Sequence, residues 1–82
     1  MTTPPSQMVT ITVNEAPVDI LGPQVTGLQI KEAAISQGVP IELTFVLSEE
    51  LPHHRTRIVG DADVVTVNPT SRFLAIANDD NS

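Results

Sequence analysis

Apolar and polar residues alternate along much of this chain, and the alternation predicts strands. In residues 8–13 every second position holds Val or Ile, the pattern of a strand that buries one face. Turn-forming residues follow at 14–17, and a shorter apolar run at 18–21 completes a predicted hairpin. The chain therefore opens with two strands that pair with each other.

The spacing of apolar residues then changes and predicts a helix of about three turns. Thr26 and Gln29 have the spacing of a capping box, in which each side chain satisfies a backbone N–H of the other residue. Gly38 is placed to adopt the left-handed conformation that ends helices, and Pro40 prevents continuation. The helix would bury Ile30, Ala33, Ala34 and Gln37 and expose Lys31, Glu32 and Ser36.

The second half of the chain predicts further strands. Residues 41–47 alternate again, 48–54 form a polar loop, 57–59 a short strand, and 64–67 and 72–77 the closing strands. A helix between two hairpin-like units packs across one face of a mixed sheet. The predicted fold class is therefore α+β, a ubiquitin-like β-grasp with a mixed four- to five-stranded sheet on one helix.

At 82 residues the chain holds one domain. We expect the β-grasp domain to span residues 8–77. Residues 1–7 carry two prolines and little to bury, which predicts a flexible lead-in. Residues 78–82 predict a polar carboxyl-terminal tail.

Charge and composition exclude several classes of partner. The formal net charge of −6 disfavours nucleic acid, whose phosphates would be repelled. The absence of cysteine excludes disulfides and thiolate chemistry. No apolar run is long enough to cross a membrane and the first residues lack the regions of a signal peptide, so we expect a soluble, cytoplasmic protein with no membrane partner.

Four segments resemble the bacterial ubiquitin-like proteins of the multiubiquitin type. They are the first strand ending in Val13-Asn14, VTGLQIKEAA at 25–34, IVGDADVVTV at 58–67, and the final strand built on Arg72-Phe73. The resemblance covers roughly residues 8–77. It implies a protein modifier encoded in a bacterial ubiquitination-like operon, with antiphage defence as one biological role.

The resemblance also implies partners. An E1-like adenylating enzyme would activate the carboxyl terminus, an E2-like protein would pass it on, and a processing protease would trim it. ATP would be used by the E1-like enzyme, so the chain itself would need no cofactor. The chain departs from ubiquitin and the sulfur carriers because it has no glycine after Gly60, which argues against a sulfur-carrier role.

The tail is the first candidate site. A protease cut after Asn78, or as a second choice after Asn81, would expose the carboxylate to be activated; Ala77 precedes the first of these cuts. Asn78 is the first polar residue beyond the predicted final strand, so the remaining end would be short. The alternative is an ordinary polar terminus without processing.

The final strand is the second candidate, as a partner-binding surface of Arg72, Phe73, Leu74 and Ile76. Phe73 and Ala75 lie on one face of the strand, and Leu74 and Ile76 on the other. If the helix covers Leu74 and Ile76, Phe73 joins an exposed apolar patch of the kind that binds partners. The alternative is that the lead-in or a loop covers Phe73.

Lys31 is the only lysine, and its predicted place is the outer surface of the helix. If copies of the protein were joined by isopeptide bonds, Lys31 or the terminal amine would be the acceptor. The alternative role of Lys31 is a solubilising surface charge.

Nothing in the sequence indicates an enzyme or a metal site. Adjacent His53 and His54 would point to opposite faces, and no third ligand with suitable spacing completes a tetrahedral set. Asp61 and Asp63 flank a predicted turn, where acids bond locally to the backbone. No serine sits in a nucleophile elbow or beside an orienting base.

The sequence thus predicts a conjugatable modifier. A non-conjugated β-grasp interaction or self-assembly module is the alternative, and an acidic antitoxin-like binder with a basic partner is a third.

Overall fold

The computed structural model describes residues 7–77, so the predicted tail and nearly all of the predicted lead-in lie outside the described residues. The first strand begins at Gln7, one residue earlier than predicted. The elements are β1 (Gln7–Val13), β2 (Ala16–Gly22), β3 (Gln24–Thr26), α1 (Gly27–Ser36), β4 (Val46–Leu51), β5 (Arg55–Val59), β6 (Val64–Thr66) and β7 (Arg72–Ile76).

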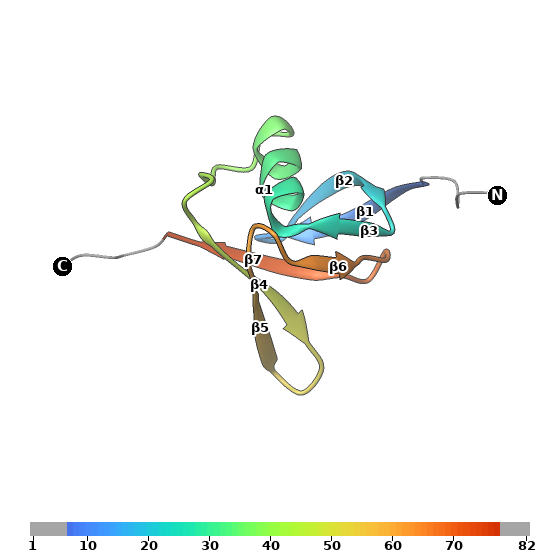
Figure 1. The fold of residues 1–82 in the computed structure, drawn as a ribbon, viewed down its shortest axis with the longest axis vertical. Helices are drawn as coiled ribbons and strands as arrows, with labels where there is room; N and C mark the ends of the chain where they lie inside the picture. Colours follow the sequence, from blue (N-terminus) through green and yellow to red (C-terminus); the bar gives the residue numbers. More distant parts are fainter. Residues whose placement is uncertain (1–6, 78–82) are drawn as a thin grey trace.

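Five strands form one mixed sheet in the order β2-β1-β7-β4-β5. Only the β1–β7 pair is parallel; β1–β2, β4–β7 and β4–β5 are antiparallel. The helix α1 packs on one face of this sheet, and the β4–β5 hairpin extends away from the body (Figure 1). This confirms the α+β β-grasp. A separate two-stranded pairing of β3 with β6 was not predicted.

Both ends of α1 follow the sequence signals. Thr26 is the N-cap, and its side chain and that of Gln29 form the predicted capping box. Gly38 follows the helix with a φ of +96°, the left-handed conformation expected there. Ile30 and Ala34 are buried as predicted, whereas Gln37 is exposed and bonds to β2 instead of entering the core.

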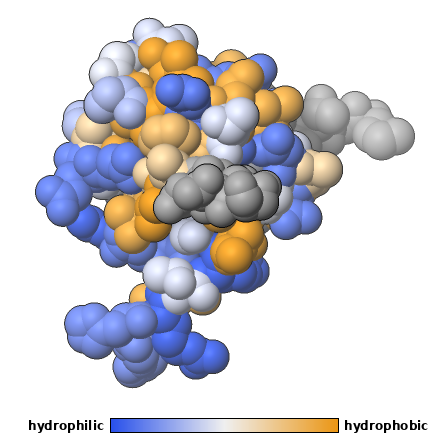
Figure 2. Space-filling view, turned by 90° about the vertical axis from the view of Figure 1, so that its left-hand side faces the viewer, coloured by the Kyte–Doolittle hydropathy of each residue, from blue (hydrophilic) through white to orange (hydrophobic). Residues whose placement is uncertain are grey.

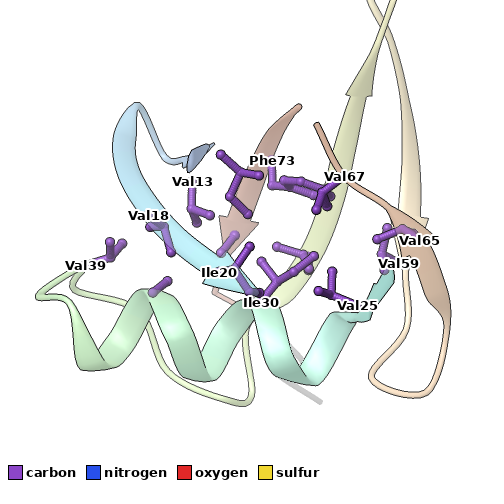
Figure 3. Close-up of a cluster of buried hydrophobic side chains, with 14 of the residues drawn as sticks. Val13, Val18, Ile20, Val25, Ile30, Val39, Val59, Val65, Val67 and Phe73 are labelled. Atoms are coloured by element: carbon purple, nitrogen blue, oxygen red, sulfur yellow. The ribbon is translucent and has the colours of Figure 1, made fainter. Parts of the chain in front are cut away.

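The core lies between α1 and the inner face of the sheet. Figure 3 shows Val13, Val18, Ile20 and Phe73 from the sheet directed toward Ile30 of the helix. Further valines close the core near β3 and β6: Val25, Val59, Val65 and Val67. Branched aliphatic side chains thus fill most of the interior, with Phe73 as the large central residue.

The predicted strand at 41–47 and the predicted loop at 48–54 are wrong over most of their length, because only 46–47 belong to a strand and only 52–54 form a turn. Ile41 is buried, but it covers the end of the core from an irregular segment, and β4 begins only at Val46 and runs to Leu51. The polar residues of β4 form a strand because they pair with β5 and β7, not because one face is buried; Glu49, for example, lies between Arg57 and Phe73. Buried and exposed side chains therefore do not alternate regularly along this hairpin.

Candidate functional site

The final strand β7 lies inside the sheet, between β1 and β4. The N–H of Asn14 donates to the Phe73 carbonyl at 3.0 Å, which continues the β1–β7 ladder. The Asn14 side chain extends it further: Nδ2 donates to the Ala75 carbonyl at 3.0 Å, and Oδ1 accepts from the Ala75 N–H at 2.8 Å. An amide side chain thus takes the place of a strand residue and holds β7 in place up to Ala75.

Sequence reasoning missed this role of Asn14. The signal was an asparagine in a two-residue turn, where its φ of 51° is a conformation that asparagine tolerates well. The pairing with Ala75 spans 61 positions of the chain, so only the folded structure reveals it.

The predicted exposure of Phe73 is wrong, because its side chain is only 1% exposed. The register sets its orientation: Phe73 lies beside Val13 of β1 and opposite Glu49 of β4, on the face that α1 covers. Because successive side chains of a strand point to opposite faces, Leu74 and Ile76 lie on the outer face of the sheet. Phe73 is therefore a core residue, and of these three residues a partner could contact only Leu74 and Ile76.

The outer face of the sheet carries an apolar patch, named here the outer patch: Val46, Ile58, Leu74 and Ile76. Ile58 is 70% exposed and Ile76 is 59% exposed, while Val46 and Leu74 are half-buried. Val46 pairs with Ile76, and Ser48 lies between Leu74 and Ile58. The patch therefore crosses β7, β4 and β5 as one surface, and Leu74 and Ile76 are the predicted binding residues that belong to it.

Charged residues border the outer patch at the hairpin end. Arg72, a predicted binding residue, is exposed, and its Nε lies 3.7 Å from Glu50 Oε1. In Figure 2 hydrophobic and hydrophilic colours are mixed on the body, whereas the projecting hairpin is mainly hydrophilic. A surface with an apolar centre and a charged border is typical of protein-binding sites.

Of the predicted processing residues, only Ala77 is described; it is exposed directly after β7. Asn78 and Asn81 lie outside the described residues.

The predicted exposure of Lys31 is also wrong. Its side chain is 6% exposed, and Nζ donates to the carbonyls of Leu43 at 2.8 Å and Phe45 at 2.9 Å and pairs with Asp61 Oδ1 at 2.7 Å. The ammonium group has three donors, so these contacts use all of them. Lys31 connects α1 to the 43–45 segment and the 60–63 turn, and it is not available as an acceptor in the folded protein.

The other polar residues considered from the sequence, among them His53, His54 and Asp63, lie in turns. His53 and His54 form the tip of the β4–β5 hairpin with φ values of 66° and 59°. Asp63 Oδ2 accepts from the Gly60 N–H at 2.8 Å, the local turn bonding expected of such acids. Within residues 7–77, no group of three or more His, Asp or Glu side chains is placed to hold a metal ion. None of the helices in that range has the length and apolar character to span a bilayer.

Comparison with known proteins gives one match. A family model described as Multiubiquitin matches residues 9–79. No curated protein and no solved structure matches the chain. The matched range contains α1, the complete hairpin β4–β5 and β7, and thus all residues of the outer patch.

Proposed function

The chain belongs to the multiubiquitin family, and from this premise we propose that it is a ubiquitin-like protein modifier. In this proposal a protease trims the tail, an E1-like enzyme activates the new carboxyl end with ATP, and an E2-like protein passes the modifier to its target. The modifier supplies a recognition surface and a carboxylate. The setting would be the cytoplasm of a bacterium with a ubiquitination-like operon.

The position of β7 is the observation that best supports this proposal. Its two neighbours in the sheet and the Asn14 side chain hold the strand up to Ala75, and Ala77 is exposed immediately after it. The end of β7 thus holds Ala77 at a fixed point of the domain. An activating enzyme needs such an arrangement, because the body can dock while the chain end enters the active site.

The outer patch is the proposed docking surface for these enzymes. Ile76 lies at the end of β7, so a protein bound to the patch would lie beside Ala77. Burial of Ile58 and Ile76 would contribute about 25 cal/mol for each Å² of apolar surface removed from water.

A reaction with the partner enzymes tests the proposal. The chain, the E1-like and E2-like proteins and ATP should give adducts that survive denaturation. Deletion of residues 78–82 should abolish them, whereas His53→Ala, at the exposed hairpin tip, should not. Intact mass after treatment with the protease should show a cut after Asn78 or Asn81. Unchanged mass and the absence of ATP-dependent adducts would refute the modifier function.

The exposed outer patch also favours a second candidate, an interaction or self-assembly module that is never conjugated. Such a module would bind its partner or another copy without forming any adduct. Ile76→Asp should then abolish binding while deletion of residues 78–82 leaves it unchanged.

A further inference from the structure

The two edges of the main sheet differ in their capacity to pair with another strand. In an antiparallel sheet, each residue of a strand directs its N–H and C=O to the same neighbouring strand, and successive residues alternate between the two sides. In an edge strand every second residue therefore directs its N–H and C=O away from the sheet. The edges here are β2 and β5.

The β2 edge is blocked. The Asp19 N–H donates to Gln37 Oε1 at 2.9 Å, and Gln37 Nε2 donates to the Asp19 carbonyl at 2.7 Å, so one side chain occupies both groups. Two residues earlier, Pro17 has no N–H to offer. An added strand would find no free group at Asp19 and no donor at Pro17.

The β5 edge is open. The alternation of hydrogen bonds across the sheet shows this. Phe73 and Ala75 of β7 direct their backbone groups toward β1 and the Asn14 side chain, so Leu74 and Ile76 direct theirs toward β4. The even-numbered residues of β4 therefore form hydrogen bonds with β7, and its odd-numbered residues form hydrogen bonds with odd-numbered residues of β5. Thr56 and Ile58 therefore direct their N–H and C=O groups away from the sheet. Within residues 7–77, no other strand pairs with β5 and no further hydrogen bond uses these groups.

The open edge borders a groove of about 210 Å³ lined by Arg57, Ile58, Val59, Asp63 and Val64. Ile58 and Val64 expose apolar side chains along it. An extended peptide on β5 would therefore gain apolar contacts at this end in addition to backbone hydrogen bonds.

The charges indicate what such a peptide carries. Three of the four cationic residues of this acidic chain, Arg55, Arg57 and Arg72, are at the hairpin or next to it. Arg57 and Arg72 pair with Glu49 and Glu50, but the ion pairs within residues 7–77 leave Arg55 without an acidic partner. Arg55 and Arg57 share one face of β5, whereas Ile58 lies on the other.

We propose that the edge of β5 is a binding site for an extended peptide that adds as a sixth strand. The peptide carries acidic residues opposite Arg55 and Arg57 and an apolar residue opposite Ile58. This site shares Ile58 with the outer patch, but peptide binding there does not require conjugation, because it uses neither the tail nor an enzyme.

The test uses the full chain labelled with ¹⁵N and a peptide of about seven residues in which aspartate alternates with valine. Titration should shift the amide resonances of residues 55–59. Thr56→Pro removes an outward N–H and leaves the β4–β5 ladder intact, so affinity should fall about tenfold, whereas Thr56→Ala should bind like the wild type. A peptide with lysine in place of aspartate should bind more weakly.

If Thr56→Pro disturbs the fold, Arg55→Gln provides a second variant, because it leaves the backbone hydrogen-bonding groups unchanged. Arg55→Gln should weaken peptide binding several-fold. The proposal is overturned if about 1 mM peptide shifts no amide or shifts only those of β2 or of Val46, Leu74 and Ile76. Equal binding of the lysine peptide would likewise overturn it. Dimers that sediment without peptide and are lost in Thr56→Pro would identify a second copy as the occupant and refute the acidic peptide.

Discussion

Replacement of Lys31 by methionine tests whether this buried cation is structural. Methionine preserves most of the side-chain length but removes the ammonium that bonds to the Leu43 and Phe45 carbonyls and to Asp61. Hydrogen bonds to a charged group contribute about 1.5–3 kcal/mol, and each buried acceptor left without a donor costs about 1–3 kcal/mol. Both carbonyls are only partly buried and regain some water, so we expect a loss of about 2–4 kcal/mol.

That loss is large against the ~5–15 kcal/mol stability of a typical domain. Because a change of 1 kcal/mol shifts Tm by about 4–8 °C in a domain of this size, Tm should fall by roughly 10–30 °C. Urea unfolding should be followed by circular dichroism, since the chain has no Trp or Tyr for fluorescence. Glu32→Met is the matched control: Glu32 is exposed on the same helix, and the change should cost less than about 0.5 kcal/mol.

Asp61→Asn separates the ion pair from the carbonyl contacts. Asp61 is 56% exposed, so its loss should cost only about 0–1 kcal/mol. Acetylation provides a second measurement, because Lys31 should react slowly in the native protein and readily in urea. A loss below about 1 kcal/mol for Lys31→Met would refute the structural role, whereas an equal loss for Asp61→Asn would assign that role to the ion pair and not to the carbonyl contacts.

Three further substitutions test the packing. Phe73→Ala should destabilise the domain by about 3–5 kcal/mol in urea unfolding, because it empties the centre of the core; a stable variant with weakened partner binding would mean that Phe73 is a surface residue. Gly27→Ala would place a Cβ in steric clash with the Gly60 carbonyl oxygen, so we expect a loss of about 1–3 kcal/mol, and an unchanged Tm would contradict this close approach. Asn14→Ala should cost about 1–3 kcal/mol and accelerate hydrogen exchange at the Ala75 amide; unchanged exchange there would show that the side-chain pairing does not hold β7.

The local features of this protein could be predicted from the sequence because each depends on neighbours in the chain. The capping box of Thr26 and Gln29 and the left-handed Gly38 involve residues only a few positions apart. The first hairpin follows from alternation on either side of a turn. These elements, in their order, were sufficient to predict the β-grasp.

The errors arise where distant contacts override the local pattern. Residues 41–45 alternate like a strand, yet Lys31 binds the carbonyls of Leu43 and Phe45, and within residues 7–77 no strand pairs with this segment. The polar segment 48–51 forms a strand because β5 and β7 pair with it. The local sequence of residues 41–51 therefore does not reveal which distant residues or strands bind this part of the chain.

The sequence by itself determined the fold class, the helix and its ends, and the alternation that divides β7 into two faces. It could not determine which face is buried, because both carry apolar side chains and only the pairing with β1 and β4 directs Phe73 inward. The same holds for Lys31, which is buried because two distant segments bring acceptors to its ammonium. Local propensity sets the elements, whereas register and long-range hydrogen bonds decide which side chains a partner can reach.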